Sequence, residues 1–255
     1  MLSKKNIKNI LIKLKLWDLL KKIAKKDIGQ PLNKNLFDEG IQFYSQFIEK
    51  DDLVFDVGAN FGNRVEIFLG LGAKVIAIEP QEKCVKYLTK KYRNKIIIEN
   101  IGLGSKNEIK QFFEADNSVL STFSDSYINK VKDTRHKTSI WKKSKLIQVK
   151  TMVELVNLYG EPKFIKIDVE GFELEVFSGF GQKSGIISFE YNVPELHNEL
   201  VACVKKLKDL GYDSFTYSIG ESMKMESKWL DSNQLLEIIS SNSFLKSGFG
   251  DIYAK

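Results

Sequence analysis

The stretch Leu53-Val54-Phe55-Asp56-Val57-Gly58-Ala59-Asn60-Phe61-Gly62 decides the fold. Its apolar run predicts a buried strand at residues 53–57, and the glycines after it predict a tight turn into a helix. About twenty residues further on, Val75-Ile76-Ala77-Ile78-Glu79-Pro80 repeats the pattern, with a second apolar run that ends in an acid. Two such strands in succession are typical of the nucleotide-binding crevice of an α/β sheet.

The spacing of the glycines separates this turn from a dinucleotide site. A dinucleotide site has three glycines in the order G-x-G-x-x-G, which bring the backbone close to a pyrophosphate. Here only Gly58 and Gly62 are present, and Asp56 precedes them. An acid at this place disfavours phosphate and suits a cationic group, such as the amino end of S-adenosylmethionine, while Gly58 leaves room for the ligand. Glu79 is placed to accept hydrogen bonds from the two ribose hydroxyls.

Strands and helices alternate through most of the chain, which predicts an α/β fold with a mainly parallel sheet covered on both faces. We expect two regions: an N-terminal helical extension over residues 1–49 and a catalytic domain over residues 50–255. Residues 115–145 have no clear period, and we expect an irregular insert there. The pattern predicts about seven main strands. The expected strands are 53–57, 74–79, 96–99, 109–113, 146–149, 164–168, 186–191, 213–217 and 249–254, and the expected helices are 40–49, 63–71, 81–92, 151–159 and 195–210.

A second group of acids follows the strand at residues 164–168. Asp168 ends this strand and Glu170 follows it, and Glu190 lies in the next expected strand. Because ligands bind outside the carboxyl ends of the strands in open α/β sheets, these acids should gather at the same edge as Asp56 and Glu79. They suit acid–base work on a hydroxyl, although capping of the following helix would also explain Asp168 and Glu170.

These motifs together support a family resemblance. The stretches Asp56–Asn63, Ile78–Pro80, Phe164–Glu173 and Gly250–Ala254 resemble, in order and spacing, the FkbM-type methyltransferases. The resemblance covers about residues 50–255. It implies the class I methyltransferase (Rossmann-like) fold with a seven-stranded sheet in the order 3-2-1-4-5-7-6, in which strand 7 is antiparallel, and S-adenosylmethionine as cofactor. It also implies O-methylation of a hydroxyl on a sugar, glycan or related small molecule.

The predicted site contains three groups of residues and no metal ligand, although the acids leave a divalent cation possible. Asn100 and Ile101, just past the third strand, are expected to contact the adenine by analogy with other proteins of this fold. Lys166 could orient substrate or only pair with Asp168, Glu173 lies near the start of a helix, and Ser121 lies in the insert. The expected cofactor contacts are Asp56, Gly58, Asn60, Gly62, Glu79, Pro80, Asn100 and Ile101; the expected catalytic residues are Asp168, Glu170 and Glu190; the expected substrate contacts are Ser121, Lys166 and Glu173.

The net charge of +6 is concentrated in two segments. Residues 1–27 carry nine lysines against two aspartates, and residues 130–145 carry seven lysines or arginines against one aspartate. Apolar residues in the first segment recur at helical spacing, which predicts a basic amphipathic helix over residues 1–26. This helix could lie on an anionic membrane surface or pack on the domain. We expect no nucleic-acid partner, because the basic residues occur without a recognisable binding fold.

The remaining composition favours a cytoplasmic protein, peripheral at a membrane surface if the basic helix binds lipid. No apolar run reaches the roughly 18 residues that suggest a membrane span, and the N-terminus lacks the features of a signal peptide. The two cysteines, Cys84 and Cys203, indicate neither a disulfide framework nor a zinc site.

Two other functions remain open beside the methyltransferase. A binding module with the same fold but no catalysis would keep the crevice. The acids Asp56, Glu79 and Asp168 argue against it, because neighbouring acids are unfavourable and a site without catalysis tends to lose them. An oxidoreductase or epimerase that uses a nucleotide cofactor would need the missing third glycine.

Overall fold

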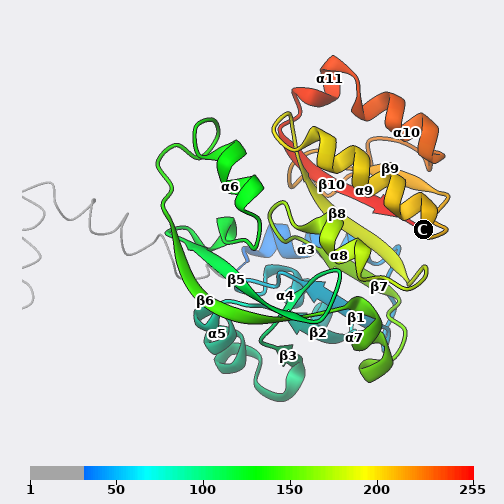
Figure 1. Cartoon of the computed structure of the whole chain (residues 1–255). Helices are drawn as coiled ribbons and strands as arrows, with labels where there is room; N and C mark the ends of the chain where they lie inside the picture. The colour runs from blue at the N-terminus through cyan, green and yellow to red at the C-terminus, as the bar shows by residue number, and fades with distance from the viewer. Residues whose placement is uncertain (1–31) are drawn as a thin grey trace, which may run out of the picture.

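A computed structural model describes residues 32–255 and places a seven-stranded sheet at the centre of the molecule (Figure 1). The strand order is β3-β2-β1-β7-β8-β10-β9, and β10 runs antiparallel to both of its neighbours. Counted within this sheet alone, the order is 3-2-1-4-5-7-6, so the predicted topology is confirmed. The strands are β1 (Leu53–Val57), β2 (Lys74–Ile78), β3 (Ile97–Glu99), β7 (Phe164–Ile167), β8 (Ile186–Asn192), β9 (Phe215–Tyr217) and β10 (Phe249–Ala254).

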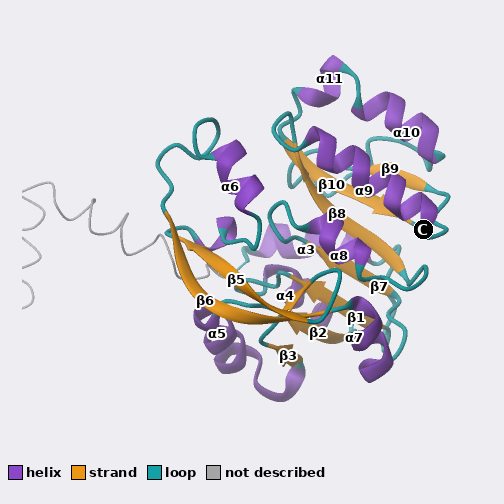
Figure 2. Ribbon diagram, in the orientation of Figure 1, coloured by secondary structure: helices purple, strands orange, loops and turns teal. Residues whose placement is uncertain are grey.

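Helices cover both faces of the sheet (Figure 2). On one face, Val54, Val75 and Phe164 pack against α3 (Lys34–Tyr44), α4 (Asn63–Gly70) and α5 (Glu82–Tyr92). The alternate residues, such as Phe55 and Ile165, face the opposite core. That core is completed by α7 (Met152–Tyr159), α8 (Glu173–Ser178), α9 (His197–Asp209), α10 (Ser232–Ile239) and α11 (Asn242–Leu245).

A second, three-stranded sheet is formed mainly by residues on either side of the predicted insert, and it contains the strands expected at residues 109–113 and 146–149. Its order is β4-β6-β5, formed by β4 (Gly102–Leu103), β5 (Glu108–Ala115) and β6 (Trp141–Lys150). The expectation of an irregular segment over residues 115–145 was therefore wrong in part: β6 begins inside it, and it also contains η2 (Ser118–Leu120) and α6 (Asp125–Val131). The first half of β6, residues 141–145, was missed because it contains three exposed lysines and no apolar period that would extend the strand expected at residues 146–149.

The N-terminal part differs from the prediction in the position of its helix. The expected helix at residues 40–49 lies at Lys34–Tyr44, where Asn33 caps it by accepting a hydrogen bond from the Leu36 N–H. Phe47 then stacks against Phe164 and Tyr253, so part of the predicted extension packs on the central sheet. The predicted basic helix over residues 1–26 lies outside the described residues.

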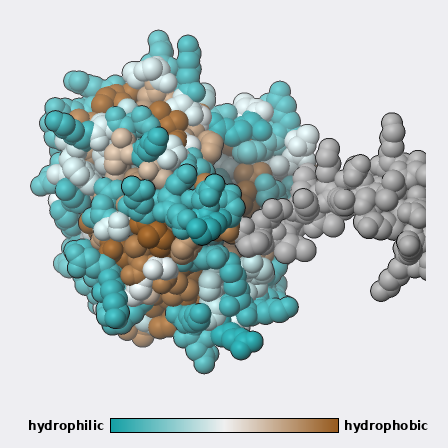
Figure 3. All heavy atoms as spheres, turned by 180° about the vertical axis from the view of Figure 1, so that it is seen from behind, coloured by the Kyte–Doolittle hydropathy of each residue, from teal (hydrophilic) through white to brown (hydrophobic). Residues whose placement is uncertain are grey.

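No helix within residues 32–255 is long and apolar enough to cross a membrane. Seen from behind, the outline of the molecule is largely hydrophilic, and hydrophobic residues gather in patches within that face (Figure 3).

Candidate active site

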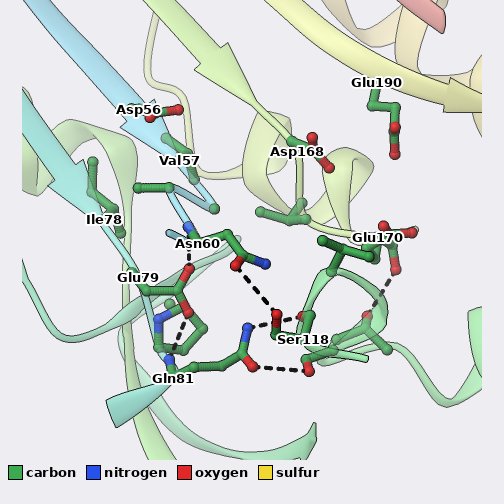
Figure 4. Close-up of a pocket in the computed structure, with 18 of the residues that line it drawn as sticks. Asp56, Val57, Asn60, Ile78, Glu79, Gln81, Ser118, Asp168, Glu170 and Glu190 are labelled. Atoms are coloured by element: carbon green, nitrogen blue, oxygen red, sulfur yellow. Dashed lines mark hydrogen bonds between the residues drawn. The ribbon is translucent and has the colours of Figure 1, made fainter. Parts of the chain in front are cut away.

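A cavity of about 510 Å³ lies at the carboxyl ends of β1, β2, β7 and β8. This volume is within the range of about 300–1,000 Å³ that small-molecule sites occupy. Its wall combines the glycine turn after β1, the residues after β2, the segment around η2 and the residues after β7 (Figure 4). Of the predicted site residues, the wall includes Asp56, Gly58, Asn60, Glu79, Pro80, Ile101, Ser121, Lys166, Asp168, Glu170 and Glu190.

Gly58 brings two strands together at the floor of the cavity. Its φ is +83°, and a Cβ built on it would lie 1.8 Å from the carbonyl oxygen of Asp168. The missing side chain thus makes room for the backbone after β7, whereas we had expected it to make room for a ligand. The turn that follows β1 and the acid that follows β7 are held in direct backbone contact.

Glu79 links the two loops that border the cavity. It is buried, and its carboxylate accepts the Asn60 N–H at Oε2 and the Gln81 N–H at Oε1, each at 2.7 Å. Burial raises the pKa of Glu79 to about 7, while the hydrogen bonds from Gln81 and Asn60 oppose this shift. The side chain is therefore held in one position, with lone pairs left for further donors.

Asp56 is a buried acid with an unused acceptor. Only 2% of the residue is exposed, and its Oδ2 has no hydrogen-bond partner among the described residues. Burial raises its pKa to about 7, while the charges of Lys166 and Arg64 act in the other direction. A buried polar atom without a partner is uncommon, so this oxygen is suited to a donor from a ligand.

Asp168, Glu170 and Glu190 form the acid cluster. One carboxylate oxygen from each lies within 4.8 Å of the others (Figure 4). Burial and the charge of Asp168 raise the pKa of Glu170 and of Glu190 well above the usual value. Lys166 Nζ lies 3.6 Å from Asp168 Oδ2. Three carboxylates could also coordinate a cation, but the charge of Lys166 already offsets that of Asp168.

Three predicted site residues lie outside the wall of the cavity: Gly62, Asn100 and Glu173. The Gly62 carbonyl accepts a hydrogen bond from the Tyr92 hydroxyl. The Asn100 amide donates to the carbonyl oxygens of Glu79 and Pro80. Glu173 Oε1 accepts the Val169 and Gly171 N–H groups. Each of the three supports a loop that borders the cavity from behind.

Two of the predicted substrate contacts make their own internal bonds. The Ser121 hydroxyl donates to Gln81 Oε1 and accepts the Ala115 N–H, at 3.1 and 3.0 Å. Lys166 is buried and donates to Asp251 Oδ1 at 2.8 Å. Both line the cavity.

Several wall residues were missed by the sequence reasoning. Gln81 and Arg64 each lie one residue beyond a quoted motif, so a wider window could have included them. Ser118 and Glu221 carry no local signal, because folding brings them to the cavity from segments far along the chain.

The sheet order, with its antiparallel strand β10, and a ligand-sized cavity at the carboxyl ends of the strands define the class I, S-adenosylmethionine-dependent methyltransferases. The model of the methyltransferase FkbM domain matches residues 56–214, and the chain belongs to this family. Its cofactor is S-adenosylmethionine. A search of curated proteins by sequence found no match.

Solved structures show a distant likeness. A TehB-like methyltransferase from Corynebacterium glutamicum shares 9% identity, with 96% of each chain covered and a TM-score of 0.44. A methyltransferase from Aquifex aeolicus shares 14% identity, with 92% of this chain and 96% of that one covered and a TM-score of 0.43. Fibrillarin from Aeropyrum pernix, with S-adenosylmethionine bound, shares 9% identity over 87% of this chain and 76% of that one, with a TM-score of 0.43. The family assignment therefore rests on the match to the FkbM model.

The buried acids predict a stability that falls as the pH rises. Burial raises the pKa values of Asp56, Glu79 and Glu173 to about 7, whereas in the unfolded chain they titrate near 4. Between these values the folded state binds more protons, so the free energy of unfolding must decrease with pH. We expect a loss of about 2 kcal/mol or more between pH 5.5 and pH 7.5, since one pKa unit corresponds to about 1.4 kcal/mol.

Urea unfolding at the two pH values measures this loss. Glu173→Gln should reduce the pH dependence because it removes one of the titrating groups, whereas Glu175→Gln, at a neighbouring solvent-exposed position on α8, should leave it unchanged. Equal or greater stability at pH 7.5 would show that these acids are not held protonated by burial.

Proposed function

We propose that the chain transfers the methyl group of S-adenosylmethionine to a hydroxyl of a sugar, a glycan or a related small molecule. The observation that carries the proposal is that one cavity contains both an expected cofactor site, at Asp56 and Glu79, and the acid cluster Asp168, Glu170 and Glu190. We propose residues 50–255 as the methyltransferase domain.

The cofactor is proposed to lie along the carboxyl edge of the sheet. Asp56, whose Oδ2 lacks a partner among the described residues, would hold its amino group, and Glu79 would accept hydrogen bonds from its ribose hydroxyls. Pro80 and Ile101 line the same cavity and offer an apolar surface for the adenine. In this proposal Gly62 and Asn100 act from behind the wall, by holding the turn after β1 and the loop after β2.

The acid cluster is proposed to bind and activate the acceptor. The sulfonium already activates the methyl group, so the main task is to hold the attacking oxygen about 3–3.5 Å from it and in line with the S–CH₃ bond. Glu170 and Glu190, whose carboxyl groups lie beside that of Asp168, can form hydrogen bonds with neighbouring sugar hydroxyls. Asp168 would accept the proton of the acceptor hydroxyl. The bound cofactor would supply the methyl group, with S-adenosylhomocysteine and the methyl ether as the products.

Methyl transfer with labelled cofactor tests this proposal. The chain is incubated with S-adenosylmethionine that carries a ¹³C-methyl group and with a panel of monosaccharides, nucleotide-activated sugars and oligosaccharides. We expect the label in an O-methyl group, which the carbon chemical shift distinguishes from an N-methyl group. Label found on nitrogen, or no label in any sugar of the panel, would contradict the proposed acceptor class.

Asp168→Asn should lower kcat about 10²- to 10⁴-fold, because the amide cannot accept the hydroxyl proton. The Kd for S-adenosylhomocysteine should stay within about threefold of the parent, since Asp168 is proposed to touch the acceptor and not the cofactor. Asp125→Asn, an exposed substitution in the first turn of α6, is the matched control. Turnover by Asp168→Asn at the rate of the parent would rule out Asp168 as the base.

A further inference from the structure

Arg64 is a wall residue that the proposed function does not use. It is the second residue of α4, directly after the glycine turn, and only 17% of its side chain is exposed. Its Nη2 pairs with Glu221 Oε2, while its buried Nε has no hydrogen-bond partner among the described residues. The guanidinium group of Arg64 therefore has one N–H donor without a partner within residues 32–255.

Arg64 and Asp56 both line the cavity, and each has one buried polar atom without a partner among the described residues. Burial raises the pKa of Asp56, and the charge of Arg64 opposes this shift. A ligand that carries an ammonium group and a carboxylate next to each other would satisfy both atoms. The amino-acid end of S-adenosylmethionine has these two groups on one carbon.

The N-terminus of α4 strengthens the preference of this place for an anion. The first N–H groups of a helix have no intrahelical partner and attract negative charge. A guanidinium group binds a carboxylate best when two parallel N–H bonds form along one edge. The edge formed by Nε and Nη2 is half used here, because Glu221 occupies Nη2 alone.

Glu221 therefore lies where a carboxylate ligand would need to bind. It comes from the segment between β9 and α10, its side chain is 60% exposed, and it lines the cavity. A ligand carboxylate that takes both N–H bonds of the edge must displace it from Nη2. The exposed side chain of Glu221 has solvent into which it can turn.

We propose that Arg64 binds the carboxylate of S-adenosylmethionine and that Glu221 competes with this carboxylate for the guanidinium group. This inference rests on the proposed placement of the cofactor along Asp56 and Glu79. Glu221 lowers the affinity for the cofactor and its product alike, and its release accompanies binding. The segment between β9 and α10 is then coupled to the occupancy of the cavity.

Calorimetric titration of the full chain with two ligands tests this inference. S-adenosylhomocysteine carries the amino-acid end, whereas 5′-methylthioadenosine lacks both its ammonium group and its carboxylate. Arg64→Met should weaken binding of S-adenosylhomocysteine by tenfold or more and change binding of 5′-methylthioadenosine by less than about twofold. Glu221→Gln should strengthen binding of S-adenosylhomocysteine by about threefold or more and leave 5′-methylthioadenosine unchanged.

Two matched controls separate a local effect from a general one. Lys91→Met removes another cation that pairs with a helix α4 acid, Glu66, outside the cavity. Glu226→Gln removes another acid from the same segment as Glu221. Neither should alter the ratio of the two affinities. Circular dichroism checks that Arg64→Met folds; if it does not, Glu221→Gln carries the test by itself.

The outcomes also separate this inference from the proposed function. If Arg64→Met weakens both ligands equally, or if Glu221→Gln weakens S-adenosylhomocysteine or leaves it unchanged, the ion pair only fastens the segment to α4 and the inference is wrong. If the parent chain binds neither ligand, the proposed cofactor placement fails, and this inference fails with it.

Discussion

Replacing Lys166 with methionine should lower the free energy of unfolding by about 3–5 kcal/mol, the usual cost of removing one partner of a buried ion pair. Lys166 is 2% exposed and Asp251 is 6% exposed, and their charged atoms lie 2.8 Å apart. Burial disfavours the charged lysine, but Asp251 and Asp168 outweigh this and raise its pKa. Without Lys166, the buried Asp251 carboxylate would lose the cation that lies 2.8 Å from it, and the more distant charge of Arg64 would be left to act on it.

Urea unfolding at pH 7.5, followed by circular dichroism, measures the loss. Lys163→Met, at an exposed lysine just before the same strand, should change stability by less than about 0.5 kcal/mol. The double variant Lys166→Met with Asp251→Asn should recover part of the loss, because no charge is then buried alone. A loss below about 1 kcal/mol in Lys166→Met would show that the ion pair contributes little to stability and that the buried acids do not need Lys166.

Gly58→Ala should destabilise the fold by about 2–5 kcal/mol and abolish measurable binding of S-adenosylhomocysteine. A left-handed backbone costs a residue with a Cβ about 1–2 kcal/mol, and forced overpacking costs about 1–3 kcal/mol more. The new Cβ would meet the Asp168 carbonyl oxygen at 1.8 Å. Because that oxygen belongs to the backbone, the contact can be relieved only by separating the turn after β1 from the end of β7.

Gly211→Ala is the control that isolates the contact. Gly211 has a φ of +98°, but a Cβ built on it has nothing within 4 Å. It should therefore show the cost of the backbone conformation alone, about 1–2 kcal/mol, and bind S-adenosylhomocysteine as the parent does. If Gly58→Ala loses no more stability than Gly211→Ala, the close approach to Asp168 is not a constraint on the fold.

The central sheet was predictable because its strands carry their own signals. Each of β1, β2 and β7 is an apolar run of the right length, and β1 is followed by glycines that need a positive φ. The alternation of strands and helices restricts the topology further, since parallel neighbours require a crossover between them. The strand order itself came from the family resemblance and not from these patterns.

The second sheet was only partly predicted: the strands expected at residues 109–113 and 146–149 lie within β5 and β6, but β4 and the first half of β6 were missed. Much of β6 is partly or fully exposed, so neither face imposes a regular apolar period on it, and its pairing with β5 contains a register shift at Gln111 and Phe113. Its conformation is decided by the partner strand and not by burial. Helix α3 was misplaced because the capping residue Asn33 precedes the apolar stretch that had marked the helix.

The sequence by itself determined which strand ends carry acids and glycines, and therefore that Asp56, Glu79 and Asp168 would meet at one edge of the sheet. The tertiary structure alone decided which charged partners the residues of the cavity have. Lys166 takes its counterion from Asp251, 85 residues away, and Arg64 takes Glu221 from a segment 157 residues away. Proton affinity and ligand contact depend on burial and on charges brought close by folding, and neither follows from spacing along the chain.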